Sequence, residues 1–421
     1  MENSQINIAQ VHQNSLKLDN YKNRGFGFFS NMSDWNPIEM LGINPKPFSI
    51  SLYRSLISDK TWKESREYLG YYSPNEDHLI EIFCEKPYVN VVASLQSLTP
   101  DGISPKIREK VVGYAIKELE SKKYLHDKIE FELALSSLFI DYELFYQRLK
   151  SYSLTEEEIS IYKNEIERIT INMFDNYQLF IDSGNKALLE LSQFENHCRK
   201  LIDTSWETVN VFQLLLDLIH KTSKLGLFYF SIMARLAFVG DHLTKQLFSQ
   251  SIISKGEYNS FYSTIKTIPS LINKAISSLR DGYISKDEFL NEFGHLRIST
   301  YDLLSPRYGE VYDQLFSTIE IKQTSNAEIS NHLNNKKVFL SYSIKDILGF
   351  TKATIENREY FKFEFTKTIS FIIEFAKKIS SFCNIDISNF AYINLLDLSD
   401  LDSRELNKNL LNERISNNKQ T

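Results

Sequence analysis

The chain has 421 residues, 42% hydrophobic and 24% charged, a composition typical of a soluble globular protein with a large core and two or three subdomains. Its net charge of −6 gives no electrostatic basis for binding nucleic acid. The 14 glycines and 9 prolines are few for this length, which favours a mainly helical fold over a many-turned β fold.

Signals for targeting and redox chemistry indicate a cytoplasmic protein. The three cysteines, Cys84, Cys198 and Cys383, lack metal-ligand spacing and form no disulfide framework, as is usual in a reducing compartment. The first ten residues are polar and contain no apolar signal region. The longest strongly apolar run, Leu225–Ala234, is too short for a membrane span. We therefore expect no membrane partner and no metal site.

The pattern along the chain predicts a multi-helix body with a small α+β subdomain near the N-terminus. Residues 1–24 are polar and without periodicity, and we expect a tail or linker there. Residues 25–135 form the expected α+β subdomain, and residues 136–400 form the helical region. Residues 401–421 are again charged and polar, and we expect a second linker.

The stretch Asp34–Pro37, which we call the DWNP turn, has the composition of a turn followed by a capped helix. Asn36 is expected to cap a short helix that begins at Pro37, with Glu39 in its positive first turn. One interpretation is a compact capped turn with a purely structural role. The other is a helix start that binds a polar or anionic ligand, with Asp34, Asn36 and Glu39 on its rim.

Residues 79–98 alternate apolar and polar side chains before a β-branched run, which predicts two short strands joined near residues 85–87. Helical periodicity then continues over residues 105–290. Within it, Thr155 and Glu158 have the spacing of a capping box before a long amphipathic helix.

One helix of this region is expected to be central. Residues 226–239 are apolar nearly all round, which indicates a buried helix. Arg235 interrupts that apolar surface, so it is either paired within the fold or directed into a pocket.

The GHLR loop, Asn291–Glu310, follows a helix that Ser285 and Glu288 are expected to cap. This loop concentrates polar, aromatic and cationic residues: His295, Arg297, Tyr301, Asp302 and Arg307. Such groups in a loop between helices are more often part of a binding or catalytic site than of a core. The alternative is a connector whose arginines tie helix ends together.

The last third is predicted to be helical over residues 337–349 and 352–383. Helical spacing places Arg358, Lys362 and Thr366 on one face. This face is either an ordinary salt-bridged surface or one wall of a site.

Three stretches of the chain resemble a known family. G-H-L-R-x-x-T-Y-D-x-x-S-P-R-Y in the GHLR loop resembles a signature of phosphoenolpyruvate-synthase-like and pyruvate-phosphate-dikinase-like phosphotransferases, closest to the branch of rifampicin phosphotransferases and capsule-pathway glutamine kinases. M-x-D-W-N-P-x-E-M-x-G resembles the entry to the central region of the same branch, and R-E-x-x-K-F-x-F-T resembles a third element. Ile298-Ser299 replaces the usual Pro-Gly, so the turn of the loop must differ.

The resemblance covers roughly residues 28–400 and implies the acceptor-binding central region of a dikinase-type enzyme. Such enzymes also have an ATP-grasp unit and a mobile domain with a phosphorylated histidine. The chain contains neither a glycine-rich phosphate loop nor a carrier-type histidine context. We therefore expect no cofactor in this chain, with ATP and magnesium bound by partner domains on the same or a separate chain. Alone, the chain should not hydrolyse ATP.

The resemblance also implies roles for individual residues. His295, Tyr301 and Asp302 would orient or deprotonate the acceptor. Arg297, Arg307 and Lys362 would stabilise developing phosphoryl charge. The expected substrate-binding residues are Asp34, Trp35, Asn36, Glu39, Tyr301, Arg307, Arg358 and Lys362.

On this hypothesis the three stretches converge to line one polar hollow. The acceptor is a small molecule: an amide such as glutamine, a hydroxyl, or pyruvate. The alternative is a non-catalytic helical scaffold derived from the same family. An independent hydrolase has little support, because the chain has no nucleophile elbow and no zinc-ligand spacing.

Overall fold

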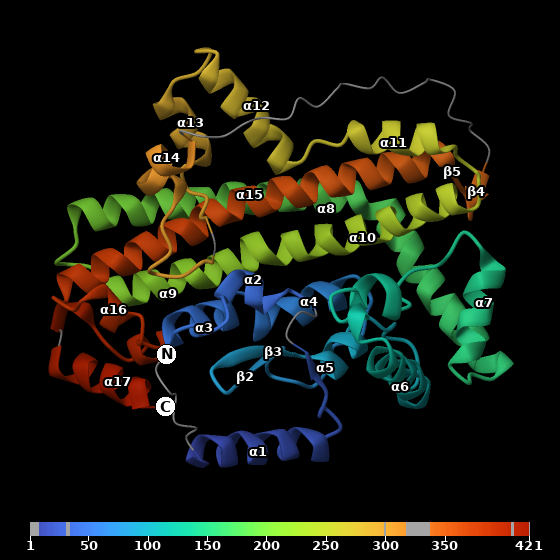
Figure 1. Cartoon of the computed structure of the whole chain (residues 1–421), viewed down its shortest axis with the longest axis horizontal. Helices are drawn as coiled ribbons and strands as arrows, with labels where there is room; N and C mark the ends of the chain where they lie inside the picture. Colours follow the sequence, from blue (N-terminus) through green and yellow to red (C-terminus); the bar gives the residue numbers. More distant parts are fainter. Residues whose placement is uncertain (1–7, 31–33, 299, 317–336, 406–407, 421) are drawn as a thin grey trace.

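The computed structural model describes residues 8–30, 34–298, 300–316, 337–405 and 408–420. The fold is mainly helical with a small antiparallel sheet near the N-terminus, as the sequence predicts. Its body consists of long helices that lie side by side (Figure 1): α8 (Glu156–Thr204), α9 (Val211–Lys221) with its continuation α10 (Phe228–Ser249), and α15 (Ile344–Phe382).

Shorter elements surround this body. The N-terminal part contains α1 (Ile8–Asn23), α2 (Pro37–Leu41), α3 (Pro47–Tyr53), η1 (Arg54–Ser58), α4 (Thr61–Tyr68), α5 (Val91–Gln96), α6 (Pro105–Ser121), η2 (Lys123–Leu125), η3 (Ile129–Leu133) and α7 (Tyr142–Ser151). The remaining helices are η4 (Thr222–Leu227), α11 (Lys255–Ser263), α12 (Ile268–Arg280), α13 (Lys286–Phe293), α14 (Tyr308–Phe316), α16 (Ile387–Phe390), η5 (Leu395–Leu398), η6 (Ser403–Glu405) and α17 (Lys408–Gln420).

The predicted hairpin is confirmed. Strands β2 (Ile80–Phe83) and β3 (Lys86–Asn90) pair antiparallel, with Cys84 and Glu85 in the turn. Strand β1 (Phe29–Ser30) pairs with the other edge of β3, which gives the order β1-β3-β2. A second, two-stranded sheet joins β4 (Lys337–Phe339) and β5 (Tyr342–Ser343). The helix predicted from residue 337 is therefore wrong over residues 337–343, and the helix begins at Ile344, after the capping residue Ser343.

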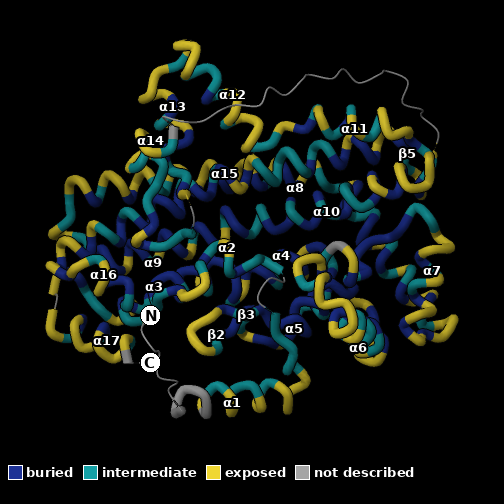
Figure 2. Tube along the Cα trace, in the orientation of Figure 1, coloured by how far each residue is buried: buried dark blue, intermediate teal, exposed yellow. Residues whose placement is uncertain are grey.

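Helices α10 and α15 form the centre of the protein, and Figure 2 shows most of the buried chain along the long helices. Glycine allows their close approach. A Cβ atom at Gly240 would lie 2.9 Å from Cα of Thr351, and one at Gly226 would lie 2.7 Å from Cβ of Phe365. Both distances are too short for any larger residue without movement of a neighbour.

The helical stretch Val211–Ser249 is long and apolar enough to cross a membrane by length and composition. Of its most apolar 18-residue stretch, 61% is buried inside the protein. Packing against α8 and α15 accounts for this apolar character, so the expectation of a buried central helix around residues 226–239 is confirmed.

Both segments predicted to be linkers contain packed helices instead. Helix α1 lies against the hairpin, where the Tyr21 hydroxyl donates to Glu81 over 2.9 Å and Lys17 pairs with the same carboxylate. Residues 1–7 are outside the described part. In α17, Leu411 is fully buried and Arg414 pairs with Asp400 at 2.7 Å. The buried apolar side chains are few, Leu411 and Ile415 in α17, and the other contacts are polar and reach distant segments, so no apolar periodicity predicts these helices.

Of three predicted helix-capping residues, two are confirmed and one is wrong. Thr155 and Ser285 both cap their helices through complete capping boxes. Helix α2 begins at Pro37 as predicted, but the Asn36 side chain makes no capping hydrogen bond. The backbone at Asn36 has a φ of 29°, which turns its side chain out of capping geometry.

One buried apolar cluster extends from Leu41 to Ile415 and joins the N-terminal part to the helical body. A smaller cluster of Ile276, Phe289, Phe293 and Phe363 attaches α12 and α13 to α15. This smaller cluster supports the start of the GHLR loop, since α13 ends at Phe293.

Candidate functional site: a basic hollow on α15

A hollow of about 570 Å³ opens along the second half of α15, and we call it the basic hollow. Its lining residues are Arg199, Ile202, Trp206, His295, Arg307, Lys367, Ser370, Phe371, Glu374, Phe375, Lys377, Lys378, Ser381 and Phe382. The residues of α15 recur at spacings of three and four and form the floor. The end of α8 supplies one wall and the GHLR loop the other.

Short antiparallel pairing closes the GHLR loop. Arg297 and Arg307 form an isolated bridge, and the Tyr308 amide donates to the Leu296 carbonyl over 2.7 Å. The amide of Gly309 donates to the carbonyl of Gly294 over 3.1 Å. These bonds bring both ends of the loop together beside α15, so His295 and Arg307 reach the same hollow.

Positive charge dominates the lining. Five cationic side chains, those of Arg199, Arg307, Lys367, Lys377 and Lys378, face one carboxylate, that of Glu374. The lysines have acidic neighbours: Lys367 pairs with Glu364 at 2.8 Å, and Lys377 pairs with Glu374 at 3.1 Å. Arg307 makes no ion pair with any described residue.

Three lining residues, Arg307, Ser370 and His295, have a buried polar atom with no hydrogen-bond partner. The Arg307 Nε atom is buried and has no hydrogen-bond partner, and the same holds for the Ser370 hydroxyl and for Nε2 of His295. Buried polar atoms in proteins nearly always have a partner, and these atoms have almost no accessible surface, so a ligand in the hollow would reach them only after a side-chain movement. Arg199 and Lys378 are also paired, with Glu195 at 2.6 Å and Asp203 at 3.4 Å, so the lining cation that favours an anion is Arg307.

His295 is neutral at pH 7. Burial, and then the nearby charge of Lys367, lower its pKa to about 4. Its ring packs edge-on against Phe363, with 4.8 Å between ring centroids. Nδ1 lies 3.1 Å from the Glu292 carbonyl, which assigns the proton to Nδ1. Nε2 has no hydrogen bond of ordinary geometry, although the Phe363 carbonyl is near enough to affect the pKa.

Arg297 lies behind the hollow and ties the loop to α15. Its side chain is fully buried, and it donates to Glu374 over 2.9 Å and to the Ser305 carbonyl. These contacts match the alternative interpretation of the GHLR loop, a connector whose arginines tie helix ends together.

Tyr301 and Asp302 face the N-terminal part instead of the hollow. The Tyr301 amide donates to the Met40 carbonyl over 3.0 Å, and burial raises the pKa of its hydroxyl. The Asp302 carboxylate accepts from Ser49 over 2.8 Å. The GHLR loop and the helix that follows the DWNP turn are therefore in direct contact.

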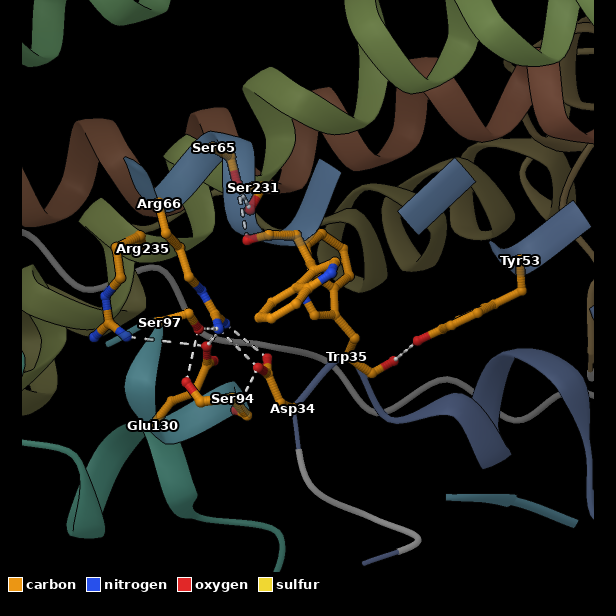
Figure 3. A network of polar contacts seen from close by, with 11 residues as sticks. Asp34, Trp35, Tyr53, Ser65, Arg66, Ser94, Ser97, Glu130, Ser231 and Arg235 are labelled. Carbon is orange, nitrogen blue, oxygen red and sulfur yellow. Dashed lines mark hydrogen bonds and ion pairs between the residues drawn. The ribbon is translucent and has the colours of Figure 1, made fainter. Parts of the chain in front are cut away.

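The DWNP turn is part of a separate buried network (Figure 3). Asp34 accepts two hydrogen bonds of 2.8 Å from Arg66 and one of 2.6 Å from Ser94. Arg66 also pairs with Glu130, and Arg235 lies 4.0 Å from that same carboxylate. The Asp34 side chain is 1% exposed, so it does not lie on an accessible rim. Of the two readings of Arg235, the structure favours pairing within the fold.

The other residues predicted in the first and third motifs are dispersed. Trp35 packs against Phe230 with ring centroids 5.7 Å apart, and the Asn36 side-chain oxygen is buried without a partner. Glu39 and Lys362 are exposed. Arg358 pairs with Glu359 at 2.6 Å.

Of the predicted site residues, His295 and Arg307 line the basic hollow, and Arg297 supports it. The expectation of one hollow shared by all three motifs is not met. Sequence reasoning missed the lining residues Arg199, Trp206, Lys367 and Ser370. The available signal was a row of cationic and hydroxyl residues at helical spacing after Lys367.

Among the described residues, no group of three or more His, Cys, Asp or Glu side chains could hold a metal ion. No protein-family model matches the chain, and comparisons with curated proteins and with solved structures give no significant match.

Proposed function

We propose that the chain binds the acceptor substrate of an ATP-dependent, phosphohistidine-using phosphotransferase, with the basic hollow as the site of transfer. ATP and magnesium would be bound by an ATP-grasp partner, and the phosphoryl group would arrive on the histidine of a carrier partner. The observation that carries the proposal is Arg307, an arginine of the GHLR loop that makes no ion pair with a described residue, in a hollow whose four other cationic side chains each pair with a carboxylate.

The chemistry that this arrangement supports is charge stabilisation with proton removal. During transfer the P–N bond of the phosphohistidine breaks and a bond from phosphorus to the acceptor forms. Arg307 and Lys367 would stabilise the negative charge on the equatorial oxygens. Neutral His295 carries its lone pair on Nε2, which is buried near the Phe363 carbonyl, so it would accept the proton that the acceptor loses only after its ring turns into the hollow. Glutamine, pyruvate and an alcohol remain possible acceptors.

A second candidate function is a non-catalytic scaffold. This function is favoured by the contacts of Asp34, Arg297 and Asp302, whose charged groups all bind other residues within the fold. In that case the motifs would persist for folding, and the hollow would take no part in transfer.

A small-molecule donor separates these two functions. The full chain is mixed with phosphoimidazole and with glutamine, pyruvate or an alcohol, and phosphorylated acceptor is measured by ³¹P NMR. We expect transfer by the wild type and a loss of roughly 100-fold in Arg307→Ala, because one charge-stabilising donor is removed. The control variant Arg168→Ala removes an arginine that is 55% exposed and distant in sequence from the lining residues. Equal rates in all three proteins, or no transfer, would favour the scaffold.

A further inference from the structure

The basic hollow has a second chemical character besides its charge. Four aromatic residues form a continuous row on its α8 side: Trp206, Phe371, Phe375 and Phe382. The Trp206 ring contacts Phe375 and Phe382 edge-on, with centroids 6.0 Å and 5.4 Å apart. Phe371 and Phe375 are stacked at 6.0 Å. These contacts fix the orientation of the indole before any ligand arrives.

This row is accessible at one end. Phe382 is 39% exposed and Trp206 is half-buried, whereas Phe375 is fully buried and forms the base of the row. An exposed, preassembled aromatic surface inside a hollow favours a flat ring as its occupant. The guanidinium of Arg199 already covers the ring of Phe371 at 3.8 Å, so the ring surface left for a ligand is that of Trp206 and Phe382.

The size of the hollow supports the same conclusion. A volume of about 570 Å³ lies within the range of pockets that enclose drug-sized ligands, roughly 300–1,000 Å³. Pyruvate would leave most of that space empty. On this floor Lys378 precedes Phe382 by one helical turn, roughly 6 Å along the axis at 1.5 Å per residue, so one ligand can contact a cationic and an aromatic side chain together.

We propose that the acceptor is an aromatic alcohol or phenol, whose ring packs against Trp206 and Phe382 and whose phosphorylated oxygen lies at Arg307. The inference rests on the proposed function for the transfer step. It narrows the acceptor to a ring-bearing hydroxyl compound and assigns Trp206 and Phe382 as specificity-determining residues. The product of transfer is then an aryl or arylalkyl phosphate, formed as the acceptor oxygen replaces the histidine nitrogen on phosphorus.

Binding of phenyl phosphate, compared with inorganic phosphate, tests the proposal on the full chain. Calorimetry gives the affinity of each probe, and tryptophan fluorescence reports on the ring. We expect phenyl phosphate to bind roughly tenfold or more tightly than phosphate, since ring packing adds to the shared anion contact. Quenching by phenyl phosphate should disappear in Trp206→Phe, which leaves Trp35 and Trp62 as the only tryptophans.

Substitutions of the aromatic residues test where the ring of phenyl phosphate binds. Phe382→Ala and Trp206→Ala should each lose most of the preference for phenyl phosphate and keep the affinity for inorganic phosphate. Phe382 is partly exposed, so its variant tests the idea even if Trp206→Ala unfolds. Tyr283→Ala, at a side chain 82% exposed on the connection between α12 and α13, is the matched control for loss of an aromatic ring.

The outcomes separate the two proposals. Equal affinity for both probes, or a preference that survives both aromatic substitutions, would overturn the aromatic acceptor and leave the phosphoryl-binding function in place. Failure of both probes to bind would remove the basis of both. Arg307→Ala should weaken both probes alike, which confirms that they share the anion contact.

Discussion

Single residues around the DWNP turn combine backbone strain with buried charge. Asp34, Trp35 and Asn36 have φ values of 30°, 58° and 29°, a conformation that costs of order 1–3 kcal/mol per residue outside glycine. The hydrogen bonds from Arg66 to Asp34 hold this turn. Burial disfavours the charge on Asp34, but the Arg66 guanidinium outweighs that effect and lowers the Asp34 pKa. Glu130 shares the same arginine, and burial and then the charge of Asp34 raise its pKa to about 7.

This raised pKa predicts a pH dependence of stability. The folded protein keeps the Glu130 proton between about pH 4.5 and pH 7, where the unfolded chain has lost it, so the contribution of Glu130 to the free energy of unfolding falls as pH rises through that window, opposite in sign to the contribution of His295. Glu130→Gln has no titrating proton at this position. Between pH 5 and pH 8 its free energy of unfolding should therefore fall less than that of the wild type. Urea unfolding at several pH values measures the difference.

Glu132→Gln serves as the control for that comparison, because Glu132 is 54% exposed and lies in the same helical turn. Its pH profile should follow that of the wild type. If Glu130→Gln also followed the wild-type profile, the proton would not reside on Glu130 in the folded protein.

At the scale of elements, the close approach of α10 and α15 depends on a missing side chain. Gly240 faces Thr351, whose hydroxyl in turn lies 3.0 Å from that of Thr244. Any Cβ atom at Gly240 would force the two helices apart or displace this buried pair.

We expect Gly240→Ala to lower the free energy of unfolding by about 1–3 kcal/mol, the usual cost of overpacking. Gly349→Ala is the matched control on α15, since Gly349 is exposed and nothing lies within 4 Å of its added Cβ. There the helix propensity of alanine should stabilise the protein by up to about 1 kcal/mol. Denaturant unfolding of both variants measures the contrast, and equal effects would show that the helix contact is not tight.

At the scale of the whole molecule, the last helix belongs to the body. Leu411 is fully buried in the large apolar cluster, and Ile415 is 5% exposed. Arg414 donates to the Asp397 carbonyl and to Asp400, which fixes α17 against the turn that precedes it. Residues 408–420 should therefore unfold together with the long helices.

Leu411→Ala tests this prediction. Loss of a fully buried leucine from a shared core should lower the free energy of global unfolding by about 2–5 kcal/mol. Leu396→Ala is the control, because Leu396 is 77% exposed and its loss should change stability by no more than about 0.5 kcal/mol. If Leu411→Ala left the global transition unchanged, α17 would be an appendage rather than part of the core.

Local sequence patterns were enough to predict the helical class, the hairpin and the helix starts at Thr155 and Ser285. Each of these depends on hydrogen bonds or periodicity within a few residues. Of the candidate site, the sequence indicated His295 and Arg307, because the GHLR loop gathers them locally.

Which charged side chains are neutralised within the fold and which stay accessible depends on the tertiary packing. Asp34 and Arg297 are neutralised by Arg66 and Glu374, partners 32 and 77 positions away in the chain. The wall that completes the hollow comes from the end of α8, about a hundred residues before the GHLR loop. Packing of the apolar helix faces sets these distances, and no local pattern encodes which polar residues those faces bring together.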